Sequence, residues 1–138
     1  MDNFIDNLKK TYCRVGVSKI HGIGVTAIRD IPKGTNPFQF TDGECPKYKI
    51  ISIHKNKLKK EKIHKNIVKM IEDFIHPVDN YYSFPYEGLN SLDITFFMNH
   101  SDNPNMEYVD NPKCEFVTFR AIKNIKEDDE LTINYNKY

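Results

Sequence analysis

The stretch Phe96-Phe97-Met98-Asn99-His100-Ser101-Asp102-Asn103-Pro104-Asn105 decides the interpretation of this chain. An apolar run breaks directly into Asn-His-Ser and then into a Pro-Asn corner, which puts several polar groups at a buried edge. Buried polar groups need hydrogen-bond partners, so such an edge is typical of a binding site. Two other stretches are predicted to meet it: Gly22-Ile23-Gly24 near the start and Glu130-Leu131-Thr132-Ile133-Asn134-Tyr135 near the end.

Length and composition favour one domain. The 138 residues can bury one sizeable core but not two, so we expect a single domain over residues 1–138. The formal net charge of +1 excludes a uniformly basic protein. No segment approaches the roughly 20 apolar residues that span a bilayer, and the N-terminus lacks a signal pattern, so we expect a soluble intracellular protein. Three widely spaced cysteines, Cys13, Cys45 and Cys114, predict neither a disulfide framework nor a structural metal, and favour a reducing compartment.

Short strands are predicted at both ends of the chain. Residues 13–20 and 25–28 are rich in β-branched side chains, and His21-Gly22-Ile23-Gly24 forms a tight corner between them. Glycines let the backbone turn sharply and let a ligand approach the main chain, although taken alone the pattern more often marks an ordinary turn with nothing bound. Further strands are predicted at 37–40, 106–109, 116–121 and 130–135, with a turn over 30–34.

The middle of the chain is strongly basic. Residues 47–69 hold nine lysines and two histidines against the single acid Glu61. Apolar residues at spacings that mix threes and fours predict a Lys-rich amphipathic helix over residues 57–75; they are Leu58, Ile63, Ile67, Met70, Ile71 and Phe74. Its lysines either hold a nucleic-acid backbone or an acidic partner, or form a solvated face.

An acidic and aromatic block follows. Residues 72–93 hold five acids and no lysine or arginine, together with Tyr81, Tyr82, Phe84 and Tyr86. This composition suits a cleft that attracts a cationic side chain by charge and by cation–π contact. Packing in a core is the alternative for these aromatic residues, and we favour it for Phe84 and one of the two neighbouring tyrosines.

The four motifs together resemble one family. In order they are Gly-x-Gly-Val (22–25), Asp-Ile-Pro-Lys-Gly (30–34), Phe-Met-Asn-His-Ser-x-x-Pro-Asn (97–105) and Glu-Leu-Thr-Ile-Asn-Tyr (130–135). Their order and spacing resemble the SET-domain protein lysine methyltransferases over residues 15–135. The resemblance implies a mostly β (β+α) fold of several small sheets with a C-terminal pseudoknot, and an insert at about 44–93 that carries the Lys-rich helix. Without the cysteine-rich zinc modules of many members, the chain is similar to the minimal viral and bacterial forms.

The resemblance also implies the roles of individual residues. Asn99 would bind the amino-acid end of S-adenosylmethionine through its side chain, and His100 would reach the adenine through its backbone, which leaves its imidazole a structural role. Tyr135 would lie at the methyl-transfer centre. The remaining cofactor contacts implied are His21, Gly22, Ile23, Gly24, Tyr82 and Tyr138, and the substrate channel would be lined by Phe40, Tyr108 and Ile133. No metal is required. Outside this family context, an Asn-His pair would indicate a core hydrogen-bond network and a tyrosine at a strand end would indicate packing.

The activity implied is transfer of a methyl group from S-adenosylmethionine to a lysine side chain of a protein. A histone tail is the leading substrate, which would place the protein in a nucleus, its own or a host's. A non-histone protein is the alternative, which would place it in the cytoplasm. Tyr108 with Ile133 favours mono- or dimethylation. A second subunit or the substrate itself would complete the site, so a homodimer is one expectation. A non-catalytic module that binds chromatin or DNA through the basic helix is the rival hypothesis, and a small-molecule methyltransferase is a weaker one.

Overall fold

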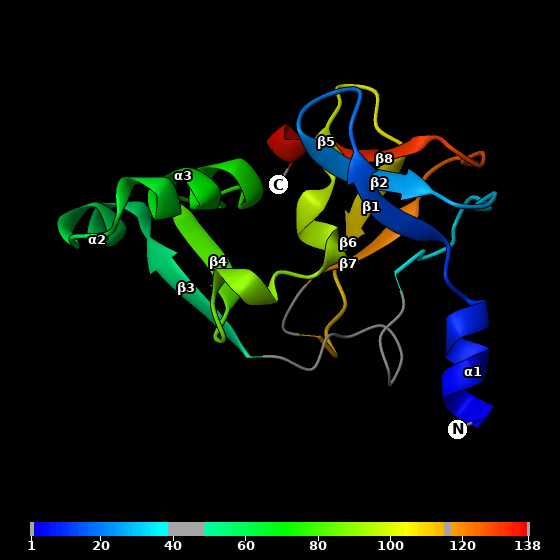
Figure 1. The fold of residues 1–138 in the computed structure, drawn as a ribbon, viewed down its shortest axis with the longest axis horizontal. Helices are drawn as coiled ribbons and strands as arrows, with labels where there is room; N and C mark the ends of the chain where they lie inside the picture. The colour runs from blue at the N-terminus through cyan, green and yellow to red at the C-terminus, as the bar shows by residue number, and fades with distance from the viewer. Residues whose placement is uncertain (1, 39–48, 115–116, 138) are drawn as a thin grey trace.

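The computed structural model describes residues 2–38, 49–114 and 117–137. Three small sheets and several short helices make up these parts of the chain (Figure 1). In the described residues the strands are β1 (Cys13–Val17), β2 (Ile23–Ala27), β3 (Ile50–His54), β4 (Tyr81–Pro85), β5 (Asn99–His100), β6 (Met106–Val109), β7 (Thr118–Ala121) and β8 (Glu130–Ile133). The α-helices are α1 (Asp2–Lys9), α2 (Lys55–Lys60) and α3 (Lys65–Phe74), and the 3-10 turns are η1 (Leu89–Ser91), η2 (Ile94–Phe97) and η3 (Tyr135–Lys137). The mostly β prediction is confirmed.

The largest sheet joins distant parts of the chain in the order β1-β2-β8-β5. Strands β1 and β2 form an antiparallel hairpin, β8 pairs antiparallel with β2, and β5 pairs parallel with β8. The last strand therefore lies in the interior of the sheet, between strands from the first and the middle parts of the sequence. A C-terminal pseudoknot requires this placement of β8.

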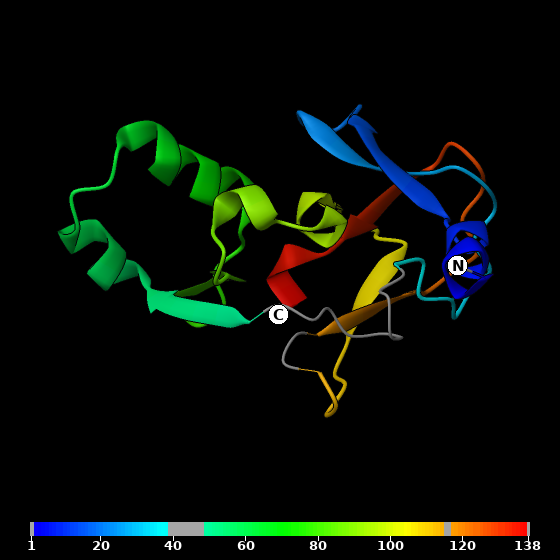
Figure 2. The same cartoon turned by 60° about the horizontal axis from the view of Figure 1, so that its bottom comes forward.

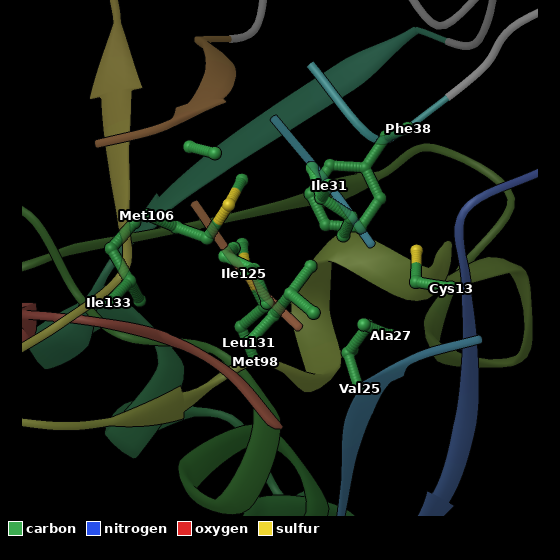
Figure 3. Packing of buried hydrophobic residues seen from close by; sticks show 11 residues of the cluster. Cys13, Val25, Ala27, Ile31, Phe38, Met98, Met106, Ile125, Leu131 and Ile133 are labelled. Carbon is green, nitrogen blue, oxygen red and sulfur yellow. The ribbon is translucent and has the colours of Figure 1, made fainter. Parts of the chain in front are cut away.

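The main core lies against this sheet. Alternate residues of β2 and β8 are fully buried because one face of the sheet packs inward, and Val25 and Leu131 have no exposed surface. Figure 3 shows these side chains packed with others from the loops and from β6; the labelled residues are Cys13, Val25, Ala27, Ile31, Phe38, Met98, Met106, Ile125, Leu131 and Ile133. This packing holds the Asn99 end of β5 against β8.

The insert has a small core of its own. Strands β3 and β4 pair antiparallel, and Ile71, Ile75 and Tyr82 are buried between that pair and α3. Phe84 and Leu58 pack against them, which confirms packing roles for Phe84 and for Tyr82. Both views show the insert at one end of the molecule, with the C-terminal turn η3 between it and the large sheet (Figures 1 and 2).

Two predicted elements differ from the structure. The single helix over 57–75 is wrong: the chain forms α2 and α3, separated at Glu61–His64. The step from Leu58 to Ile63 is five residues, which turns a helix by about 140° away from a common face. His64 then starts α3 as its N-cap, because its Nδ1 accepts a hydrogen bond from the Asn66 amide at 3.1 Å. The predicted strand at 37–40 is absent in Pro37 and Phe38, and residues 39 and 40 lie outside the described chain.

Two further findings concern the end of the last strand and the cysteines. The last strand ends at Ile133, and Tyr135 begins the turn η3 instead of closing the strand. Cys114 is disulfide-bonded, whereas Cys13 is a free and buried cysteine. The disulfide was not expected, because the spacing of three cysteines does not reveal which of them meet in space.

Candidate active site

The Asn99 side chain brings the three predicted stretches together. Its Nδ2 lies 3.0–3.1 Å from four oxygens, which are Ser18 Oγ, the carbonyl oxygens of His21 and Ile23, and Glu130 Oε2. An amide nitrogen carries only two hydrogens, so Asn99 can donate to at most two of these four oxygens at a time. The meeting of the Asn-His edge, the glycine corner and the last strand is therefore confirmed, and it produces a site rich in acceptor oxygens.

Ser18 connects the glycine corner to Glu130. Its hydroxyl donates to the Glu130 carboxylate at 2.7 Å, and it accepts hydrogen bonds from the amides of Ile20 and His21 at 2.9 and 3.1 Å. Sequence reasoning missed both side chains as parts of the site. A serine three residues before a glycine corner is a known turn signal and could have indicated Ser18, whereas the role of Glu130 depends on the pairing of distant strands.

The two glycines of the corner serve different purposes. Gly22 has φ +53°, a left-handed conformation that other residues adopt only with strain, and the space beside it is open. Gly24 has an ordinary backbone, but a Cβ there would lie 2.8 Å from Glu130 Oε2 and 3.0 Å from Asn99 Nδ2. Gly22 shapes the turn, and Gly24 makes room for the two polar side chains.

Asn105 fixes the last strand in place. Its Nδ2 donates to the Glu130 carbonyl oxygen and its Oδ1 accepts from the Thr132 amide, both at 2.8 Å. One side chain thus satisfies two backbone groups of β8. The Pro-Asn corner therefore has a structural function next to the binding edge.

His100 has the structural role expected for its imidazole. Nδ1 accepts a hydrogen bond from the Tyr135 amide at 3.0 Å, so the proton of the neutral ring lies on Nε2, which is 2.9 Å from Asp102 Oδ1. The His100 backbone is paired with Ile133 of β8. Because His100 directly follows Asn99, this contact fixes Tyr135 beside the Asn99 site.

Tyr135 joins that site to a cavity of about 510 Å³. Its hydroxyl donates to the Met98 carbonyl oxygen, and its ring lines the cavity. Burial and the negative charge of Glu130 raise the pKa of Tyr135 above the ordinary tyrosine value. The phenol therefore stays protonated at neutral pH.

The cavity lies where the insert meets the large sheet and the β6–β7 pair. Tyr108 and Ile133, two predicted channel residues, line it together with Tyr135, and so does Tyr82 from the insert. Three acids of the predicted acidic block, Glu72, Asp73 and Asp93, also line it. The cavity is thus mostly aromatic and aliphatic, and its charged lining residues are three acids and one lysine, Lys55, a surface suited to a long cationic side chain.

His76 is a cavity residue that sequence reasoning missed. Its ring stacks on Tyr135, with centroids 5.1 Å apart and an interplanar angle of 29°. Partial desolvation lowers the pKa of His76, a hydrogen bond to the Tyr135 backbone opposes this, and electrostatic interactions with His100 and Lys55 add to the lowering. His76 is therefore neutral at pH 7. A histidine at an insert boundary carries no local motif, so only the folded chain reveals it.

The remaining predicted residues divide into two groups. Tyr82 is buried in the insert, where burial and the charge of Glu72 raise its pKa. It has no hydrogen bond with the Asn99 network in the described structure. Phe40 and Tyr138 lie outside the described residues. Among residues 2–38, 49–114 and 117–137, no group of His, Cys, Asp and Glu side chains is arranged to hold a metal ion, and no helix is long and apolar enough to cross a membrane.

Comparison with known proteins agrees with this architecture. A family model described as the SET domain matches residues 22–136, so the chain belongs to the SET-domain family. The crystal structure of a Plasmodium falciparum protein described as a putative histone methyltransferase is similar to this one. The TM-score is 0.52 and the sequence identity 25%, over 91% of this chain and 93% of that chain. A sequence search of curated proteins gives no match.

The cofactor used by this family fits the acceptor oxygens of the site. SET-domain methyltransferases use S-adenosylmethionine and act on proteins. That cofactor carries an ammonium and a sulfonium, and both are complementary to the Glu130 carboxylate and to the carbonyl oxygens of His21 and Ile23 around Asn99. The open space beside Gly22 leaves the main chain of the corner accessible. The residues present therefore fit the cofactor of the family.

Proposed function

We propose that this chain is a protein lysine N-methyltransferase that uses S-adenosylmethionine. The proposal rests on the position of Tyr135. Its amide donates a hydrogen bond to His100 beside the Asn99 site, and its ring lines the cavity. One residue thus connects a site suited to the cofactor with a cavity suited to a lysine. The corner from His21 to Gly24, together with Asn99, would hold the amino-acid end of the cofactor.

The chemistry assigned to this chain is positioning. When bound, the cofactor supplies a methyl group on a sulfonium, and a neutral amine must approach it in line. A lysine ammonium has a pKa of about 10.4, so the site must favour the neutral amine by removing water from it. The apolar lining from Ile133, Met98 and Phe96 supports this desolvation. Tyr135, kept protonated, holds the amine through its hydroxyl oxygen, and alignment provides much of the acceleration.

The substrate proposed is an extended histone tail. Glu72 and Asp93 at the cavity attract a basic segment, and Asp73 adds less because it pairs with Lys69, whereas an acidic or neutral segment gains nothing from them. Such a substrate would place the protein in a nucleus. A non-histone protein with lysine in a basic context is the alternative, and a second copy of the chain or the substrate itself would close the channel.

The proposed product is mono- or dimethyllysine. Tyr108 lines the cavity near Phe119, with ring centroids 5.0 Å apart, and its hydroxyl would occupy space beside the amine. An amine that already carries two methyl groups needs room to rotate before a third transfer. Ile133 has the opposite effect, because a side chain without a hydroxyl leaves more room for a methylated amine and so favours further methylation.

Labelled S-adenosylmethionine with mixed core histones tests the proposal. Transfer should label a histone lysine, located by mass spectrometry, and Tyr135→Phe should reduce the rate about a hundredfold because the amine loses its orientation. Tyr86→Phe is the matched control, because Tyr86 is exposed and does not line the cavity.

The outcomes separate the hypotheses. Labelling of other proteins but not of histones would keep the enzyme and change the substrate. Cofactor binding measured by calorimetry, without transfer to any protein in a cell extract, would refute the methyltransferase proposal, as would the absence of cofactor binding. In the latter case the rival hypothesis of a non-catalytic interaction module would replace it.

A further inference from the structure

The tip of the insert carries a group of lysines that the methyltransferase proposal does not use. Five exposed lysines occur within nine residues of α2 and the start of α3, and we call them the lysine face: Lys57, Lys59, Lys60, Lys62 and Lys65. None of the five forms an ion pair with any described residue, and Glu61 is the one acid among them. Lys69, further along α3, differs because it pairs with Asp73 at 3.2 Å.

The local structure gives these charges no compensation. Neither α2 nor α3 has an acidic residue in its first turn, although the amino end of a helix favours negative charge. Lys57 and Lys60 are three residues apart on one helix, where like charges repel by a few tenths of a kcal/mol. A face that only needed to be soluble would mix both signs at lower cost. The face thus carries positive charge that no described residue compensates.

The composition of the face discriminates between anionic partners. Insertion into a membrane as an amphipathic helix would need exposed apolar side chains, but the only apolar residue of α2, Leu58, packs against the insert core. Lysine is a compact point charge that suits phosphate oxygens, whereas the arginines that commonly read bases in pairs of hydrogen bonds are absent from residues 49–69. The face therefore fits a nucleic-acid backbone without sequence preference.

The position of the face leaves the active site accessible. Both views place α2 at the end of the insert farthest from the large sheet that carries Asn99 (Figures 1 and 2). Duplex DNA carries one charge per about 1.7 Å of its axis, so a helix about 9 Å long with its following turn can face several phosphates. Contact there and substrate binding in the cavity are compatible.

We infer that the lysine face binds the phosphate backbone of duplex DNA. This binding does not depend on the proposed methyl transfer. If all five lysines contact phosphates, the slope of log K against log salt is about −4.5, and affinity falls about 500-fold between 50 and 200 mM salt.

Fluorescence anisotropy with a labelled 20-base-pair duplex tests the inference on the full chain. Replacing Lys57, Lys59 and Lys60 together by Gln should reduce the slope by about 2.7, because three phosphate contacts are lost. Replacing the same three by Arg should retain both the affinity and the slope, since the charge is kept.

The matched control is a triple substitution of equal net charge elsewhere. Lys10, Lys33 and Lys126 are exposed and lie outside the insert, so changing all three to Gln should leave the slope unaltered. Circular dichroism melting of each variant shows that the helices persist.

Three results would overturn the inference. They are no binding to the duplex at 50 mM salt, equal loss in the two Gln triples, and binding to poly-glutamate or to phosphatidylserine vesicles with the same affinity and the same response to the variants. The Arg triple and the salt slope of the wild-type protein decide the question even if the first Gln triple unfolds.

Discussion

Gly24 offers the sharpest test of the site geometry. In Gly24→Ala the new Cβ would lie 2.8 Å from Glu130 Oε2 and 3.0 Å from Asn99 Nδ2, inside van der Waals contact. Glu130 must shift its carboxylate to relieve the overlap, which weakens or breaks its hydrogen bonds with Ser18 and Asn99. Charge-assisted bonds of this kind contribute about 1.5–3 kcal/mol when buried, and Glu130 is half-buried, so we expect a loss of about 1–3 kcal/mol.

Two measurements follow from this estimate. In a domain of this size the melting temperature should fall by about 4–12 °C, as measured by calorimetry. Because Asn99 is displaced by the new Cβ and loses Glu130 as one of its four oxygen partners, the affinity for S-adenosylmethionine, measured by isothermal titration, should fall about tenfold or more, which corresponds to about 1.4 kcal/mol.

Gly16 provides a matched control on the neighbouring strand. It pairs directly with Gly24 in the β1–β2 hairpin, but a Cβ there would meet no atom within 4 Å. Gly16→Ala should therefore leave cofactor affinity unchanged and should change stability by less than about 1 kcal/mol, in the favourable direction if chain entropy dominates. Wild-type melting and wild-type cofactor affinity in Gly24→Ala would refute the reasoning, because the crowding around Asn99 would then have no consequence.

Three further predictions concern single side chains. Asn105→Ala leaves the Glu130 carbonyl and the Thr132 amide without their partner, so urea denaturation should show a loss of about 2–4 kcal/mol, and a loss below about 0.5 kcal/mol would contradict this role. The pKa of His76 is lowered below the ordinary histidine value, so the cavity is free of its charge at neutral pH and gains a positive charge only at more acidic pH. Binding of a lysine peptide should weaken in that acidic range. His76→Gln should remove this dependence, and a persisting dependence would point to another group. Burial raises the pKa of Cys13 to about 12, so thiol reagents at pH 8 should label it only after unfolding, and rapid labelling of the native protein would show that it is accessible.

Local patterns were sufficient for much of the site. The corner at Gly22 and Gly24 and the Asn99 edge were recognised from residue types that have few other uses, namely two glycines two apart and a polar break in an apolar run. Their meeting was predicted from the order of motifs and is confirmed by the hydrogen bonds of Asn99. Whether these residues bind the cofactor, as proposed, is a matter for the titration described above.

The insert shows where local patterns fail. Apolar spacing predicted one helix, yet β3 and β4 pair across 26 intervening residues, and α2 and α3 pack separately beside them. Strand pairing at such a separation is set by burial on the partner strand, which no window of sequence contains. His76 was missed for the same reason, because its partner Tyr135 is distant in the chain.

The amino-acid sequence by itself determined the family, the motifs of the candidate site, the β-rich fold and the segregation of basic and acidic blocks, since each depends on short patterns of residue type. Only the tertiary structure decided that Ser18 and Glu130 support Asn99, that His76 stacks on Tyr135, and that the acids of the insert line one cavity with Tyr108 and Ile133. The physical reason is that β8 enters the sheet between β2 and β5, so its neighbours come from segments more than thirty residues away, and their contacts exist only once the sheet has formed.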